Sequence, residues 1–497
     1  TLGQLEDVTF DASGQTFTFG EDIDYITEDI IVTVGTTVDM DVRSLTVANS
    51  KTITNNGTWS APSSPSTLTC AGSATFAGEG MNFYNFSAQI PSSTITFQGT
   101  KTYTVSNNLV LEGGDGTELH LTSHDGSATA VISNTGGTQT VDYVKVEEVD
   151  GTALNEIVAT NSWDINRTLS FWDFGPMLYT FDTTGDWDIA SNWEQNILPA
   201  EIDNIIVNGG VTLTLNGDRT INDVQIAATG AITVAADVFT VDGDCDNDGD
   251  ITVTTGTVDV SGVIDATGGN ITFTGAGELT ADSTVISLGT LSADNGTVIY
   301  KADTGQNILA GAYYNLKASD DSGTKALGGA VTVAGALTID AGVTVAMAAN
   351  TLAVTGASTI NGTLDVAGST VTMTGAGDVN GTITASTGTI DANGAFDATG
   401  GNVTFTGAGN LQLQGTVTSL GTLTDATHGT VTYDAAGDQT IVADTYVNLI
   451  AGGGAGTKTL AGAVVVAGTF TTDASVTTAM GANNLTVAGA TTIPGTV

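Results

Sequence analysis

The densest run of metal-ligand side chains in the sequence places an aspartate at every second position. Its members are Asp244, Asp246, Asp248 and Asp250, with Gly249 in the turn position. Carboxylate oxygens at alternate positions are the hard ligands that Ca²⁺ prefers, and a glycine in the sixth position of a calcium loop permits its sharp turn. The twelfth position holds Thr255 instead of a bidentate acid. The pattern is therefore consistent with a calcium loop or with a solvated turn, and the missing acid favours the turn.

A second group of ligand-type residues lies in the first half of the chain. It consists of Glu118, His120, His124 and Asp125. On a strand, Glu118 and His120 share one face, whereas His124 and Asp125 follow in a turn. A shared metal ion needs both pairs to converge, so separate surface groups are the favoured interpretation.

Composition excludes several classes of function. The chain has 54 Asp+Glu against 10 Lys+Arg, a net charge of −44, which repels nucleic acids and anionic membranes. No Gly-x-Ser-x-Gly motif, phosphate loop or Cys-His pairing appears. No apolar run approaches the roughly 18 residues of a membrane span. We expect no catalytic residues, no nucleic-acid partner, no membrane span and no cofactor other than the calcium considered above.

An internal repeat shows how the chain is organised. The segment 265–277 returns as 397–409, and the match extends through two copies, 230–361 and 362–497. A fixed period of this kind is typical of solenoids, in which each unit buries its apolar face against its neighbours. The later parts of the two copies slip by a single position, and we expect this slip in a turn.

Short strands and tight turns fill both copies. Alternations such as Ile251-Thr252-Val253 are punctuated by Asn-Gly, Asp-Gly and Gly-Gly, and helical spacing is absent. The lack of Trp and Pro between Ala200 and Ile493 argues against a row of immunoglobulin-like sandwiches. We predict an all-β fold, a parallel β-helix (β-solenoid) rod. Coils of roughly 20 to 25 residues give about six coils per copy.

The first part of the chain, up to Ala200, differs from the rest because it contains every tryptophan. These are Trp59, Trp163, Trp172, Trp187 and Trp193. Residues 1–178 are expected to form an aromatic-richer β region, also β-helical but with insertions. Residues 179–229 are expected to form a Trp-containing lead-in or cap segment. Cys70 and Cys245 are too few for a disulfide framework, and we favour buried, unpaired thiols.

Two stretches carry a family resemblance. Residues 185–193, followed by Pro199 and 203–207, and the units 314–316 and 323–327 resemble motifs of bacterial secreted and surface β-strand-repeat proteins. Those proteins are similar to autotransporter passengers and filamentous-haemagglutinin-type adhesins. The resemblance implies a parallel β-helix outside the cell or on its surface, and it implies scaffolding without shared catalytic residues.

Three functions are compatible with such a solenoid. The leading hypothesis is a non-catalytic structural subunit of an extracellular fibre, because the second copy stops at a repeat boundary without a polar or aromatic cap. Self-association, head to tail, is then expected to involve Thr1, Leu2, Phe10, Phe17, Leu485, Val487, Ile493 and Val497. The alternative is a monomeric cell-surface adhesin stalk within a longer polypeptide, binding glycans of a host or neighbouring cell. The third is a glycan-active, tailspike- or lyase-like β-helix.

Overall fold

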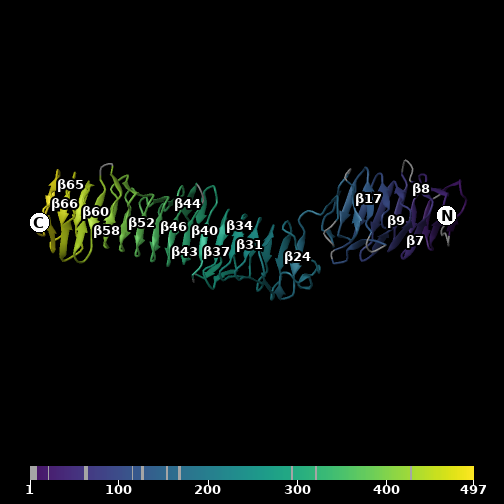
Figure 1. The fold of residues 1–497 in the computed structure, drawn as a ribbon, viewed down its shortest axis with the longest axis horizontal. Coiled ribbons are helices and arrows are strands. Elements are labelled where there is room, and N and C mark those ends of the chain that lie inside the picture. The colour runs from purple at the N-terminus through teal and green to yellow at the C-terminus, as the bar shows by residue number, and fades with distance from the viewer. Residues whose placement is uncertain are drawn as a thin grey trace. The chain divides into compact units, whose positions relative to one another are not determined.

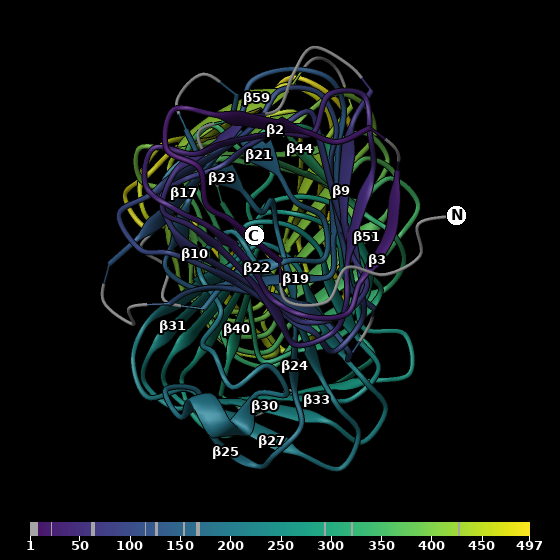
Figure 2. The same ribbon diagram turned by 90° about the vertical axis from the view of Figure 1, so that its right-hand side faces the viewer.

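The chain divides into two compact units, Thr1–Leu178 and Tyr179–Val497. The structure, a computed structural model, describes residues 8–20, 22–60, 65–114, 116–124, 128–152, 155–165, 169–292, 295–319, 322–425 and 428–497. Within each unit the strands stack as successive coils (Figure 1), and the coils enclose a core when seen nearly end-on (Figure 2). The chain makes about 23 such turns, and its sheets are parallel. The prediction of an all-β parallel β-solenoid is confirmed.

Unit 1, residues 1–178, has longer coils and a more aromatic core. Its largest sheet takes every third strand from β1 (Val8–Phe10) to β22 (Trp163–Asp164). Tyr103 pairs with Ile132, a longer step along the chain than the pairing of Ile232 with Ile251 in unit 2. Aromatic side chains pack in the space that these coils enclose, with ring centroids 4.7–6.3 Å apart among Phe76, Phe97 and Tyr103. Large aromatic side chains thus fill the wider cross-section.

Unit 2, residues 179–497, has three faces, and from β28 onward each coil adds one strand to each face. The first face runs from β24 (Leu178–Phe181) to β38 (Val285–Ser287), then from β41 (Gln306–Ile308) to β59 (Thr422–Asp425), then from β62 (Thr445–Tyr446) to β68 (Leu485–Val487). The second runs from β25 (Gly185–Asp186) to β39 (Thr290–Ser292), then from β42 (Gly311–Tyr313) to β69 (Thr491–Thr492). The third runs from β28 (Arg219–Ile221) to β58 (Val417–Ser419), then from β61 (Gln439–Ile441) to β67 (Val476–Ala479).

The core of unit 2 consists of like residues stacked one above another. Ile232, Ile251 and Ile271 pair in register on successive coils and are at most 2% exposed. Residues next to these isoleucines along each strand point outward. This alternation of inward and outward side chains is the pattern from which the sequence predicted strands. Removing such an isoleucine from water contributes about 1.5 to 3 kcal/mol. The stacked apolar side chains therefore fix the register of every coil.

Aromatic side chains fill the first coil of unit 2. Trp187 and Trp193 are buried, with ring centroids 5.0 Å apart, and Phe181 packs edge-on against Trp193. The short 3-10 helix Ala190–Asn192 connects the two tryptophans.

Cys245, in a later coil, is buried and free, as is Cys70 in unit 1, which confirms the expectation for both thiols. No helix in the described ranges is long and apolar enough to cross a membrane.

The repeat does not contain a whole number of coils. The shift that carries 265–277 onto 397–409 also carries β33 (Asp250–Val253), on the second face, onto β53 (Thr382–Ala385), on the first face. That shift is twenty strands, or six turns and two strands. The expectation of about six coils per copy is therefore corrected to six and two thirds. Six coils in a shift of 132 residues would need 22 residues per coil. Ile232 pairs with Ile251 and Ile390 pairs with Leu411, which are coils of 19 and 21 residues. The second copy is consequently rotated by one face relative to the first.

One corner glycine in each copy is required by geometry. Gly421 has φ +62°, and a Cβ there would lie 2.2 Å from the Gly401 carbonyl oxygen. Gly289 occupies the same position in the first copy, with φ +58° and the same 2.2 Å approach to Gly269. The close stacking of coils at this corner excludes a side chain.

We expect Gly421→Ala to lower the free energy of unfolding by about 1 to 3 kcal/mol, because it adds left-handed backbone strain and a backbone clash. Gly437→Ala is the matched control, since no atom lies within 4 Å of its added Cβ. Urea unfolding followed by circular dichroism measures both variants. Equal unfolding midpoints for the two variants would contradict this account of the corner.

Candidate functional site

The four aspartates of the proposed calcium loop lie on the outside of unit 2. Asp244 precedes β32 (Cys245–Asn247), Asp246 lies within it, and Asp250 begins β33. Asp244 Oδ1 accepts a hydrogen bond from Val263 N at 2.7 Å. Asp250 Oδ1 accepts one from Asn270 Nδ2 at 2.6 Å, and Asp246 Oδ2 accepts one from Gln225 Nε2 at 3.2 Å. These three carboxylates therefore bind the neighbouring coils.

Asp248, the fourth aspartate, is exposed in the turn between β32 and β33. Across the part of the chain that the structure describes, no group of three His, Cys, Asp or Glu residues could hold a metal ion. The calcium site stays a prediction of the sequence.

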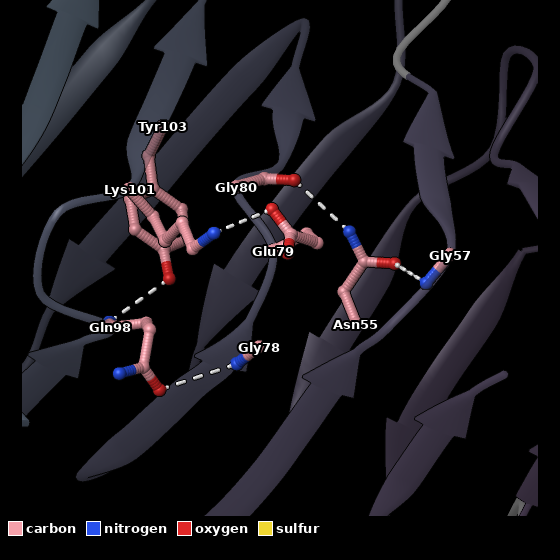
Figure 3. A network of polar contacts seen from close by, with 8 residues as sticks. All are labelled: Asn55, Gly57, Gly78, Glu79, Gly80, Gln98, Lys101 and Tyr103. Carbon is pink, nitrogen blue, oxygen red and sulfur yellow. Dashed lines mark hydrogen bonds and ion pairs between the residues drawn. The ribbon is translucent and has the colours of Figure 1, made fainter. Parts of the chain in front are cut away.

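A buried asparagine organises this turn, and it is not among the residues predicted from the sequence. Asn247 is 0% exposed; its Oδ1 accepts from Gly249 N at 3.1 Å and its Nδ2 donates to Asn270 O at 3.1 Å. Unit 1 repeats the arrangement at Asn55, which binds Gly57 N and Gly80 O (Figure 3). The spacing Asn-x-Gly at the end of a strand is the signal that could have identified it.

The second group of ligand-type residues forms cross-coil contacts. Glu118 contacts Lys145 at 3.1 Å, and His120 contacts Glu147 at 3.2 Å. Burial lowers the pKa of His120, against the attraction of Glu147. His124 lies beyond β16 (Leu119–Ser123), and Asp125 lies outside the described residues. Lys145 pairs with His120 in the parallel ladder, and its ammonium is the group that contacts Glu118.

The predicted self-association residues occupy the first and last described coils. Phe10 and Phe17 are half-buried, with ring centroids 5.2 Å apart. Leu485 and Val487 are half-buried on β68, while Ile493 and Val497 are 46% and 45% exposed. Thr1 and Leu2 lie outside the described residues.

The most distinctive feature of unit 2 is a sheet break that occurs once in each copy. In the first copy the sheets ending at β38 and β39 stop, and new sheets begin at β41 and β42. In the second copy the sheets ending at β58 and β59 stop, and new ones begin at β61 and β62. Among the described residues, one of the three ladders crosses each break. It joins β37 (Glu278–Ala281) to β40 (Thr297–Tyr300) in the first copy and β57 (Asn410–Leu413) to β60 (Thr430–Tyr433) in the second.

A buried glutamine bridges the two sides of each break. Gln439 Nε2 donates to Leu413 O at 2.8 Å and to Gly415 O at 2.9 Å, and its Oε1 accepts from Ala435 N at 3.2 Å. Its counterpart, Gln306, donates to Ala281 O at 3.0 Å. The amide thus replaces hydrogen bonds that the interrupted ladder does not make.

A tyrosine pair closes the corner beside the glutamine. Tyr446 Oη donates to Val442 O at 2.7 Å, Tyr433 Oη accepts from Val442 N at 3.1 Å, and the two hydroxyls lie 3.0 Å apart. Tyr300 and Tyr313 repeat this geometry at 2.9 Å in the first copy. Burial raises the pKa of Tyr433 to about 12 and also raises the pKa of Tyr446, so both hydroxyls are protonated at neutral pH.

A fully buried lysine completes the cluster. Lys458 is 0% exposed, and its ammonium donates to Ala435 O at 2.6 Å, Gly437 O at 3.0 Å and Gln439 Oε1 at 3.4 Å. Lys325, also 0% exposed, donates to Ala302 O in the first copy. Burial lowers the pKa of Lys458, while Asp434 and Asp438 oppose that shift. The ammonium therefore holds turn carbonyls together from inside the coil.

Equivalent polar grooves open beside the two glutamines. The second-copy groove has a volume of about 410 Å³ and is lined by residues that include Gln414, Thr416, Asp438, Thr440 and Thr459. The first-copy groove has a volume of about 190 Å³ and includes Asp282, Thr284 and Asn307. Their hydroxyl, amide and carboxylate groups can form hydrogen bonds, but these described lining residues include no nucleophile paired with a base.

Comparison with protein-family models, with curated proteins and with solved structures found no match. Of what the family resemblance of the repeats implies, the parallel β-solenoid fold is shown.

Acid is expected to stabilise unit 2. Burial and neighbouring carboxylates raise the pKa of Asp259 and Asp434 above the usual value near 3.8. As the pH falls through the raised values, the folded state takes up protons before the unfolded state, so the free energy of unfolding rises. Thermal unfolding at pH 7 and pH 5 should show a higher midpoint at pH 5.

The double variant Asp259→Asn/Asp434→Asn provides the control. At pH 7 the double variant should unfold at a higher temperature than the parent chain. Its unfolding midpoint should rise less than that of the parent chain when the pH is lowered to 5. A parent midpoint that falls between pH 7 and pH 5 would contradict the assignment of these two groups.

Proposed function

We propose that the chain is a non-catalytic structural subunit of an extracellular fibre and that its end coils stack head to tail. The observation that carries the proposal is the partial exposure of core-type residues on β68. Leu485 and Val487 are half-buried there, whereas their first-copy counterparts, Leu352 and Val354, are each 1% exposed. A further coil on β68 would bury both side chains, as the coil after Leu352 and Val354 does.

The backbone supports the same proposal. Strands β68 and β69 are the outermost described strands of their sheets, and a stacked neighbour would pair with them there. An open sheet edge is a template for another strand, and a contact between unlike ends continues into a filament unless it closes.

The first described coil offers an apolar surface for the other side of such a contact. Phe10, Phe17 and Phe19 form one cluster, with ring centroids 5.2 and 6.1 Å from Phe10. Phe10 and Phe17 are only half-buried, so a neighbouring coil could cover more of each ring. Burial of such aromatic area is a major source of interface stability.

The second candidate function is an adhesin stalk on the cell surface, in which a longer polypeptide supplies the next coil and glycans are the partner. The same exposed residues on β68 favour it. The two proposals differ in whether the isolated chain polymerises. A glycan-active enzyme is supported less well, because Glu79 and Glu118 in unit 1 are paired with Lys101 and Lys145.

Leu485→Asp and Val487→Asp should each prevent assembly, because a buried carboxylate would lie in the proposed contact. Thr486→Asp is the matched control, since this exposed residue lies between them on the same strand. Sedimentation and negative-stain microscopy at low and high salt measure assembly, and salt should promote it by screening the net charge of −44.

The proposal fails if the parent chain stays monomeric at every salt and protein concentration. That result would favour the second candidate function, the adhesin stalk. The proposal fails equally if the Leu485→Asp and Val487→Asp variants polymerise as the parent chain does.

A further inference from the structure

We infer that each copy of the repeat contains one built-in joint, at the sheet break, where neighbouring coils separate before the rest of unit 2 does. A solenoid coil is held by three ladders of backbone hydrogen bonds. In the part of the chain that the structure describes, one ladder remains at each break, from β37 to β40 in the first copy and from β57 to β60 in the second. Local opening occurs first where the fewest such bonds must be broken.

The chain encodes the break in the same way in both copies. A register irregularity precedes it, where Ile264 pairs with Val285 but Asp265 pairs with Ser287. The second copy has the same irregularity at Phe396 and Asp397. A bulge of this kind inserts one residue, bends the strand and increases its twist, which turns the edge away from the following coil. The corner glycine with positive φ follows shortly after each of these strands.

A buried glutamine then bridges the opened edges, and other side chains order the coil that follows the break. The glutamine amide spans the gap, and the tyrosine hydroxyls satisfy the corner carbonyl and amide of Val442 or Leu309. The buried lysine holds the loop that carries Ala435 or Ala302. Of these side chains, the glutamine is the one that bonds to the coil before the break, whereas the tyrosines and the lysine bond residues of the coil after it. The arrangement is therefore a joint, closed but weaker than an ordinary coil.

The two joints open on different sides of unit 2. In the first copy the first and second faces are interrupted and the third is continuous. In the second copy the third and first faces are interrupted and the second is continuous. The interrupted faces differ between the copies because the second copy is rotated by one face relative to the first. The continuous ladder acts as the hinge line, so the two joints permit bending about two different faces.

Hydrogen exchange of the full chain, read by mass spectrometry, tests the joints. We expect amides of β58 and β38, which precede the breaks, to exchange at least tenfold faster than those of β52 (Gly377–Val379), an inner strand of the same sheet as β58. Equal protection of all three strands would overturn the proposal without the use of any variant.

Two reciprocal variants locate the effect. Gln439→Leu should raise exchange at β58 and β61 and leave β38 and β41 unchanged, whereas Gln306→Leu should do the reverse. Each variant serves as the control for the other, because both remove the same amide in the same repeat. A uniform rise in exchange across unit 2 with either variant would show a general loss of stability and would also overturn the proposal.

Discussion

The in-register parallel ladder between successive coils is the constraint on which the rest of the structure depends. The strands of each coil must run parallel to those of the preceding coil and pair with them in register. Inward positions of successive coils therefore lie above one another and hold stacked Ile, Val and Leu residues such as Ile251 and Ile271. Corners must be narrow, which places glycine at Gly421. Turn amides must find partners across coils, and the buried Asn55 and Asn247 provide them. A solenoid built in this way can present its ends to further coils.

The sheet breaks show what happens where this ladder is interrupted. A bulge and a left-handed glycine lie where two of the three sheets end, and a buried glutamine donates hydrogen bonds across the break. The tyrosines and the lysine bond the turns of the coil that follows. The buried lysines are notable in a chain with only 10 basic residues. Burying an ammonium is unfavourable unless every donor is satisfied, and Lys458 meets that condition with two carbonyls and one amide oxygen. One such buried ammonium occurs in each copy, in the coil that follows the sheet break.

Much of this fold could be predicted from the sequence, because a long internal repeat and a strand-like alternation can both be read directly from the chain. The number of coils per copy could not, since it depends on how many residues each corner takes. The aspartate run predicted a calcium loop, which stays a prediction; its cross-coil hydrogen bonds from Val263 and Asn270 to Asp244 and Asp250 depend on which coils are neighbours. Both buried lysines occupy inward strand positions that their charge alone would assign to the surface. The internal repeat aligns Lys325 with Lys458, but this correspondence does not reveal that both side chains are buried.

The central claim is that assembled chains continue the coil stack through their ends. X-ray diffraction from aligned fibres of the purified chain tests it most directly. The account predicts a reflection at about 4.8 Å along the fibre axis, because the ladders of every subunit then point along the filament. A reflection at about 4.8 Å at right angles to the axis, or single particles that never form fibres, would contradict head-to-tail stacking of the coils.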